Sequence, residues 1–307
     1  MTTAVTAANT GAASTVVAPP GSTASKSTAP LPAPATDGEV SLALAVKRSD
    51  TVVTRRYQRA PLRVFTPRSD ESGLLQAVVA NISGGLVGGD RLGVKVELGP
   101  GARALVLGQA AEKVYRALPG SHCSLDTRLD VGDGGWLEYM PQGTILFDGC
   151  RLRRQTTVCV QGDARALVGE MLILGRVSSG EELGDVAFNE SWTVKVDGRL
   201  AWADRLRLPE GQAWLLSASA GFGGARALAT LLYLAPDAAG QLDTARQVIA
   251  DCAQGTRASV SCPGPLLVLR LLDEDPARLR EALGRCWAAL RQRLAGLVEL
   301  TPTVWSA

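Results

Sequence analysis

Four glycine-containing turns recur at nearly even intervals through the middle of the chain. They begin at residues 99, 132, 162 and 197, which are 33, 30 and 35 residues apart. Each turn lies between two short strand-like segments of alternating apolar and polar residues, such as 94–98 and 104–107. The last turn, Asp197-Gly198, is typical of a two-residue β-hairpin. A unit repeated at this interval predicts a mostly β fold, with stacked β-hairpins in a β-helix-like arrangement.

The last third of the chain changes to helical patterns. Residues 243–253 carry apolar side chains at helical spacing, and the apolar run 265–272 predicts a buried strand. Asp275-Pro276 then favours a helix start, because acids stabilise the positive end of a helix and proline fits its first turn. The apolar stripe of that helix is predicted to be Leu279, Leu283, Cys286, Trp287, Leu290 and Leu294. We therefore expect α-helices in the C-terminal third.

Residues 1–38 differ in composition from the rest. Up to Thr36 they are mostly Ala, Thr, Ser, Pro and Gly, and Lys26 is their only charged side chain. Such a segment buries too little apolar surface to offset its ordering entropy, which predicts a disordered tail at 1–38 and one β-rich domain at 39–307. The tail lacks the features of a secretory signal, and the chain has no apolar run of about 18 residues to span a membrane. We expect a cytoplasmic protein without a membrane partner.

The charge balance and the histidine and cysteine counts argue against several functions. With 32 Lys and Arg against 30 Asp and Glu, the chain lacks the basic excess typical of nucleic-acid binding. It has one histidine, and its six cysteines form no C-x-x-C pair, so buried reduced thiols are favoured over structural zinc. His122 and Cys123 adjoin, but their turn-like sequence favours a solvated loop, and two ligands leave other metal positions unfilled. We expect no tightly bound metal.

Three acids interrupt the apolar faces of predicted strands. Because side chains two residues apart share a face, Glu138, Glu170 and Asp204 each stand in line with large apolar residues. A buried carboxylate needs a partner, water or a cation, or it holds its proton. The pattern leaves two interpretations open. One is a salt bridge to an arginine such as Arg176 or Arg205, and the other is an acid-lined interior formed where repeats stack.

The segment 84–90 is rich in glycine but is not a phosphate-binding loop. Asp90 stands where such a loop carries lysine, and a carboxylate repels phosphate. The chain also has no G-x-S-x-G nucleophile sequence. Paired acids leave open a β-solenoid hydrolase acting on a carbohydrate or similar substrate, and a plain β interaction module is a further alternative.

Five segments, in order, resemble the UreD family of urease accessory proteins, called UreH in some bacteria. They are residues 83–92, 109–116, 137–147, 174–181 and 204–206, so the resemblance runs from about residue 61 to 208 and continues in style through the Trp287 helix. The motif positions are Gly84, Gly85, Gly88, Gly89, Lys113, Tyr115, Pro141, Gln142, Gly175, Arg176 and Glu181. Three places depart from the family pattern: Asn81-Ile82-Ser83 before the double glycine, Glu112 where a small hydroxyl residue is common, and Thr303 where arginine is usual.

The resemblance implies a non-catalytic urease maturation factor with a mostly β fold. UreD-like proteins bind UreF, which recruits the GTPase UreG, and the assembly acts on apo-urease to install nickel. The implied assembly is a dimer of heteromers, with nickel in transit along an interior route and not kept as a cofactor. The matching positions for that route are Asp90, Glu138, Glu170 and Asp204. Carboxylate oxygens suit transit because they hold Ni²⁺ less tightly than imidazole or thiolate sets.

Overall fold

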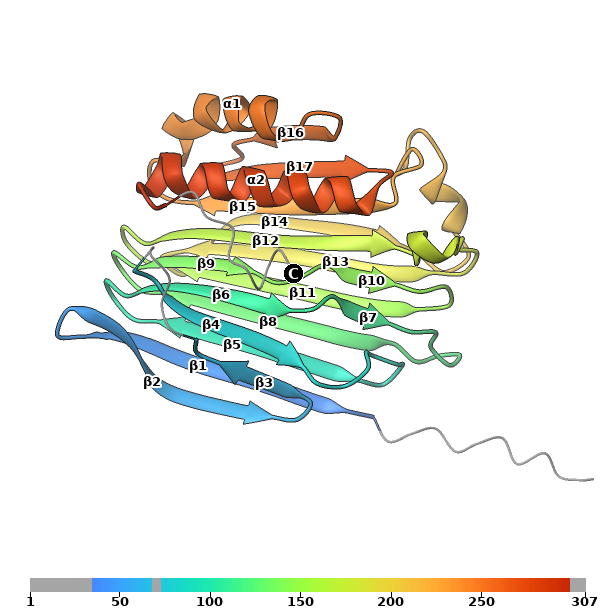
Figure 1. Ribbon diagram of the computed structural model, residues 1–307, viewed down its shortest axis with the longest axis horizontal. Coiled ribbons are helices and arrows are strands. Elements are labelled where there is room, and N and C mark those ends of the chain that lie inside the picture. The colour runs from blue at the N-terminus through green and yellow to red at the C-terminus, as the bar shows by residue number, and fades with distance from the viewer. Residues whose placement is uncertain (1–34, 68–72, 299–307) are drawn as a thin grey trace, which may run out of the picture. The chain divides into compact units, whose positions relative to one another are not determined.

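The computed structural model describes residues 35–67 and 73–298, which form two stacked β-sheets and two α-helices (Figure 1). The first sheet has seven strands in the order β14 (Arg199–Leu208), β13 (Ala187–Val196), β11 (Arg151–Val160), β8 (Cys123–Val131), β5 (Arg91–Leu98), β1 (Asp37–Lys47) and β2 (Asp50–Arg59). The second has ten strands: in order β16 (Arg257–Ser261), β17 (Leu266–Asp273), β15 (Ala227–Leu234), β12 (Arg165–Leu174), β9 (Trp136–Met140), β6 (Arg103–Gln109), β4 (Leu75–Asn81) and β3 (Leu62–Phe65), with β7 (Glu112–Val114) and β10 (Thr144–Leu146) beside them.

The chain winds as a coil that alternates between the two sheets. Strands β5, β8 and β11 pair in parallel in the first sheet, and β6, β9 and β12 do so in the second. The mostly β, β-helix-like prediction is therefore confirmed. One detail differs from the prediction. The strands on either side of the turns at residues 99, 132 and 162 do not pair as hairpins, because each pairs with the neighbouring coil of its own sheet. Only the last of the four turns, Asp197-Gly198, joins an antiparallel pair, β13 and β14.

The glycine turns stack on one another along one side of the coil. Asp133 Oδ1 accepts a hydrogen bond of 2.7 Å from the Asp163 amide, and the Gly162 amide donates to Asp197 Oδ1 at 2.9 Å. Gly162 has a φ of 53°, and a Cβ atom there would lie 2.1 Å from Asp133 Oδ1. Both the backbone angle and the close approach require glycine at this position. The spacing of the turns in the sequence thus reflects the length of one coil.

Two apolar cores lie on the two faces of the second sheet. The first fills the space between the sheets and includes Leu42, Val96, Leu129, Val106, Leu137 and Val168. The second lies between the other face of the second sheet and the helices α1 (Leu242–Cys252) and α2 (Pro276–Ala295). Figure 1 shows α2 lying across β15 and β17, and the six residues of its predicted apolar stripe are all buried. No helix of the described residues has the length and apolarity to cross a membrane.

The predicted C-terminal elements are confirmed, with small shifts at their ends. Helix α1 and strand β17 occupy the expected places, and Asp275 caps α2 by accepting a 2.8 Å hydrogen bond from the Ala277 amide. The described part of the chain also forms three short 3₁₀ helices. Helix η1 (Val177–Ser179) follows β12, η2 (Ala213–Leu216) follows β14, and η3 (Ala238–Gln241) directly precedes α1.

Strand β1 begins inside the predicted tail. Asp37 and Gly38 pair with Arg91 and Leu92 of β5, and the Arg91 amide donates to Thr36 O at 2.8 Å. This pairing extends the folded domain two residues beyond the predicted boundary at residue 39. Residues 1–34 lie outside the described residues, so their disorder stays a prediction.

Candidate functional site: an intersheet cavity and the motif segments around it

Two strands of the second sheet are interrupted near one end. The chain leaves the sheet between β6 and β7, at residues 110–111, and again between β9 and β10, at 141–143. Beyond these breaks, β7, β10 and the end of β12 run side by side in parallel, with Thr144 opposite both Glu112 and Leu172. Because side chains alternate along a strand, Glu112 and Thr144 face the first sheet, whereas Lys113, Ile145 and Ile173 face outward. These three strands form a wall with a distinct inner and outer surface.

The inner surface of the wall lines a cavity of about 110 Å³ between the two sheets. Its lining is mainly apolar, with a few polar groups that include Glu112, Thr144, Arg154 and Glu170. The side-chain amide of Asn81 donates hydrogen bonds from Nδ2 to both carboxylate oxygens of Glu112, at 2.9 and 3.0 Å. Burial raises the pKa of Glu112, and these bonds offset the rise only in part. Glu112, which itself departs from the family pattern, thus lines the cavity. Its hydrogen-bond partner, Asn81, belongs to a second segment that departs from this pattern.

A buried ion cluster borders the cavity. The Arg154 guanidinium lies 3.1 Å from Glu170 Oε2 and 2.6 Å from Glu190 Oε2, each measured from its nearest nitrogen. The Thr156 hydroxyl donates to Glu170 Oε1 at 2.5 Å, and the Trp192 indole N–H donates to Glu190 Oε1 at 2.9 Å. Burial raises the pKa of Glu170 to about 7, against the opposing charge of Arg154. The cluster holds two carboxylates and a single cation.

The glycine-rich segment closes the wall beside β7. Leu86 forms a bridge with Val114, the Leu86 amide donates to Lys113 O at 2.7 Å, and the Tyr115 amide donates to Leu86 O at 2.8 Å. Gly85 has a φ of 140°, and a Cβ atom there would lie 2.6 Å from the Tyr115 ring. Glycine is therefore required for the close approach of this motif to the next one.

Asp90 ends this glycine segment and holds its backbone. Its carboxylate accepts hydrogen bonds from the amides of Thr36 at 2.7 Å and Val87 at 2.9 Å. Asp90 is 4% exposed and does not line the cavity among the described residues. The structure therefore gives this predicted route residue a visible role in shaping the loop.

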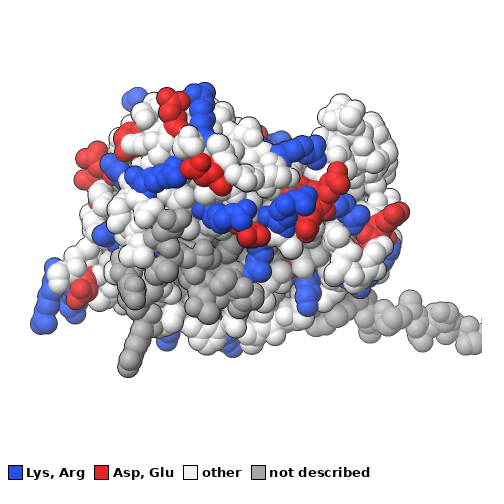
Figure 2. Space-filling view, turned by 45° about the horizontal axis from the view of Figure 1, so that its top comes forward, with Lys and Arg blue, Asp and Glu red and all other residues white. Residues whose placement is uncertain are grey.

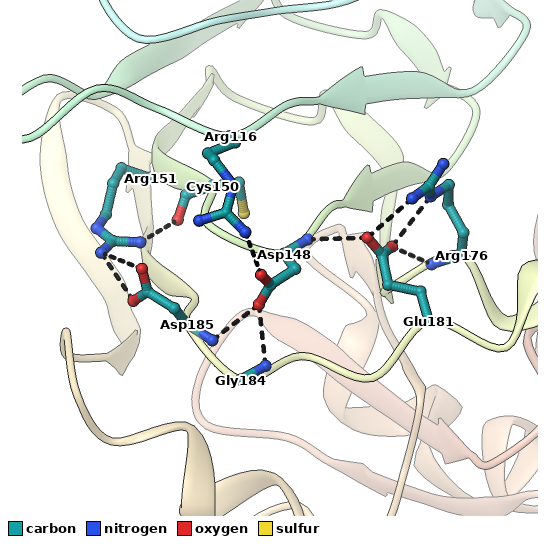
Figure 3. Close-up of polar contacts among 8 residues, drawn as sticks. All are labelled: Arg116, Asp148, Cys150, Arg151, Arg176, Glu181, Gly184 and Asp185. Carbon is teal, nitrogen blue, oxygen red and sulfur yellow. Dashed lines mark hydrogen bonds and ion pairs between the residues drawn. The ribbon is translucent and has the colours of Figure 1, made fainter. Parts of the chain in front are cut away.

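On the outer surface, motif residues from three coils stack together. The Tyr115 and Phe147 rings meet edge to face with centroids 4.9 Å apart, and the Arg176 guanidinium lies 4.7 Å from the Phe147 centroid. Arg176 also pairs with Glu181 at 3.2 Å, as Figure 3 shows. These side chains lie beside an open groove lined by Lys113, Ile145, Ile173, Gly175, Val177 and the start of α2.

A polar network fixes the loops at the end of this groove (Figure 3). Asp148 Oδ1 accepts hydrogen bonds from the amides of Gly184 and Asp185 at 2.9 and 2.8 Å, and Asp148 also pairs with Arg116. Arg151 joins the carboxylate of Asp185 at 2.8 Å. Glu181 links this network to the stacked cluster, because its Oε1 lies 3.4 Å from the Asp148 amide. The loops after β7, β10 and β12 are thereby held as one unit.

Pro141 and Gln142 fill the second interruption in the sheet, and both line the cavity. Gln142 is 8% exposed, and its Oε1 accepts a hydrogen bond of 3.2 Å from Arg280 of α2. Gln142 therefore joins the cavity wall to the helix on the other face of the sheet.

The predicted route residues do not come together in one interior. Of the four predicted positions, Glu170 alone is among the described residues that line the cavity. Glu138 faces the opposite side of the second sheet, toward α2, because Trp136 and Met140 on its face pack in the helix-side core. Asp204 is half-buried on β14 and pairs with Arg270 at 2.7 Å. The arginine partners of these acids are Arg154, Arg291 and Arg270, not the predicted Arg176 or Arg205.

Glu138 is the centre of a second buried network. Its carboxylate accepts from the Trp136 indole at 3.0 Å and from the Trp287 indole at 2.6 Å, and Arg291 Nε lies 3.2 Å away. Glu138 and Arg291 are both 0% exposed. Burial raises the pKa of Glu138, while Arg291 and the two indoles oppose the rise. The network anchors α2 to the second sheet.

Sequence reasoning missed Arg154 and Glu190. Glu190 alternates with Phe188, Trp192 and Val194, which is the same signal that identified Glu170. Arg154 could be found only with the strand register, which places it opposite Glu190 in the neighbouring parallel strand.

The described residues contain no group of three or more His, Cys, Asp or Glu side chains arranged to hold a metal ion. His122 is exposed and Cys123 is buried. Burial also raises the pKa of Cys123 to about 12, which disfavours the thiolate that binds metals. His122 and Cys123, although adjacent in the sequence, thus lie in different environments and do not form a pair of metal ligands.

Comparison with known proteins accounts for the clustering of the motifs. A family model described as "UreD urease accessory protein" matches residues 36–306. This chain belongs to the UreD family. A UreD 2 protein of Methylorubrum populi is 40% identical over 80% of this chain and 81% of its own length. The UreD of Magnetococcus marinus is 36% identical over 89% of this chain and 95% of its own length. Membership of the UreD family supports a role in urease maturation.

The face of the molecule drawn in Figure 2 carries charges of both signs. Figure 2 shows Lys and Arg side chains interspersed with Asp and Glu side chains across the face drawn. Helix α2 itself carries ion pairs: Arg285 pairs with Glu281 within the helix at 2.6 Å, and Arg293 pairs with Asp251 of α1 at 2.9 Å. The face drawn is therefore not a patch of a single sign.

Proposed function

We propose that this chain binds UreF, and UreG through UreF, on apo-urease, and that nickel passes to urease through the cavity between the two sheets. One observation carries the proposal: the family motif segments build the wall of a cavity that is bordered by a buried carboxylate, Glu170. In this proposal the chain is not an enzyme and carries nickel only in transit. It works in the cytoplasm, as part of a dimer of heteromers.

The cavity has the donor chemistry that transit needs. Glu112, Glu170 and the Thr144 hydroxyl offer oxygen ligands, which bind Ni²⁺ less tightly than imidazole or thiolate. Burial raises the pKa of both Glu112 and Glu170, so a proton competes with the metal at each carboxylate. This competition favours weak binding that can be reversed.

The outer groove supports a docking role on the same wall. Tyr115, Arg176 and Lys113 are motif residues whose side chains face away from the cavity, and Val177 is 37% exposed beside them. We place the contact with UreF on this groove. Nickel could then enter or leave the cavity next to the partner.

A paired-carboxylate hydrolase fits the cavity less well. A volume of about 110 Å³ is well below the roughly 300–1,000 Å³ of typical ligand pockets. The two acids of the ion cluster beside the cavity, Glu170 and Glu190, are also both held by Arg154. No observation favours a hydrolase. The nickel measurement described below distinguishes the proposed nickel route from a plain interaction module.

The test is complementation of a strain that lacks this gene, with nickel per urease measured by mass spectrometry. Glu170→Gln should lower the nickel content of urease while UreF and urease still co-purify with the variant. Glu182→Gln, at an exposed acid outside the cavity, is the matched control. Val177→Asp should weaken UreF co-purification, whereas Leu200→Asp, at a residue 64% exposed on β14, should not. Full nickel loading with Glu170→Gln would contradict the nickel route.

A further inference from the structure

The ion cluster beside the cavity has an unusual composition for a buried site. Arg154, Glu170 and Glu190 are 5%, 4% and 4% exposed, and each comes from a different strand. When both acids are ionised, the cluster has a net charge of −1, and an unbalanced buried charge is costly. A divalent cation in the place of the guanidinium would make the cluster neutral.

The pairing inside the cluster is also incomplete. Arg154 Nη2 donates to Glu190 Oε2 at 2.6 Å, and Nη1 donates to Thr144 Oγ1 at 3.2 Å. Arg154 Nε and Glu170 Oε2 lie 3.1 Å apart, yet neither atom has a hydrogen-bond partner among the described residues. Both residues line the cavity. The contact between Arg154 Nε and Glu170 Oε2 is thus a buried ion pair without hydrogen-bond geometry at the border of the cavity.

We propose that Arg154 occupies a latent divalent-cation site formed by Glu170 and Glu190, and that a metal ion reaches these carboxylates only when the guanidinium moves away. The hydroxyls of Thr144 and Thr156 complete an oxygen-rich set of ligands, which accepts Ni²⁺ and other divalent ions. The physiological meaning rests on the proposed function, because Arg154 then controls when nickel can pass. The binding site itself does not depend on urease.

The test measures Ni²⁺ binding to the purified, untagged full chain by calorimetry and by thermal unfolding with and without nickel chloride. Arg154→Met keeps the length of the side chain and removes its charge. It should gain one Ni²⁺ site at least tenfold tighter than any in the wild type, with a midpoint of unfolding that rises when nickel is added. Arg154→Lys keeps the charge and should behave as the wild type does.

The variant Arg154→Met/Glu190→Gln separates this site from adventitious binding, because it should lose the gain. If Arg154→Met does not fold, Arg154→Gln is measured in the same way. Equal nickel binding by the wild type and the neutral variants, or a gain that survives Glu190→Gln, would overturn the proposal. A gain in binding without any effect of Glu170→Gln on urease would contradict the nickel route and leave the latent site standing.

Discussion

Glu138→Gln should destabilise the protein strongly, although the two side chains have nearly the same shape. All the groups that surround this carboxylate are donors: the indoles of Trp136 and Trp287 and the Arg291 guanidinium. A glutamine amide would point its own N–H groups at one of them and would remove the negative charge that pairs with Arg291. Both charged side chains are fully buried, so water cannot replace the lost contact.

The expected loss of stability follows from this geometry. Removing one partner of a buried ion pair costs about 3–5 kcal/mol, because the other charge stays buried and uncompensated. For a domain of this size, each kcal/mol lowers the midpoint of thermal unfolding by about 2 °C. Glu138→Gln should therefore unfold roughly 6–10 °C below the wild type. Tryptophan fluorescence is a suitable readout, since two indoles contact the substituted group.

The double variant Glu138→Gln/Arg291→Met provides the control. It also removes the buried charge that faces the substituted group and leaves one amide oxygen for an indole N–H, so it should recover much of the loss. A single variant within about 1 kcal/mol of the wild type, or a double variant less stable than the single, would refute the anchoring role. The double variant should also support urease activation, because Glu138 faces the helix and not the cavity.

Three further substitutions test other parts of the structure. Asp273→Asn should cost about 1–3 kcal/mol at pH 7. Burial alone would raise the pKa of Asp273, but hydrogen bonds from Arg278, the Asp275 amide and Thr256 hold this pKa below its usual range. The difference in stability between the wild type and the variant should therefore close as the pH falls below about 4. Gly162→Ala should lower stability by about 1–3 kcal/mol through strain and the contact with Asp133, whereas Gly211→Ala, with a φ of 74° and no atom within 4 Å, should cost about 1 kcal/mol. Asp204→Asn should change stability by at most about 1 kcal/mol in urea unfolding, because its pair with Arg270 is partly exposed, and a larger loss would contradict that estimate.

The repeating architecture is readable from the sequence because turns and alternation are local properties. The glycine turns mark each passage between sheets, and the apolar stripe of α2 follows from helical spacing. The partner of each strand is not a local property. The strands beside the turns at 99, 132 and 162 have the patterns of hairpin strands, and only the stacking of successive coils decides that they pair across coils.

The same limit explains the candidate site. Alternation shows that Glu138 and Glu170 lie among apolar residues, but all five residues of β9 are buried, so both faces of that strand meet a core. Whether an acid faces the first sheet or α2 depends on a helix that begins more than 100 residues later in the chain. Arg154 escaped detection for a related reason, since only the parallel register brings it to Glu170 and Glu190.

The central claim is that nickel passes through the cavity, and filling the cavity tests it without altering any charge. Leu125 is a half-buried residue of the cavity lining, and Leu125→Trp would occupy part of its volume. Val53→Trp, at a partly buried apolar residue outside the lining, is the matched control. The measurement is nickel per urease from the complemented deletion strain, with co-purification of UreF and urease and thermal unfolding verified for both variants. The account predicts low nickel with Leu125→Trp and normal nickel with Val53→Trp. Normal nickel with a folded, assembled Leu125→Trp protein would contradict it.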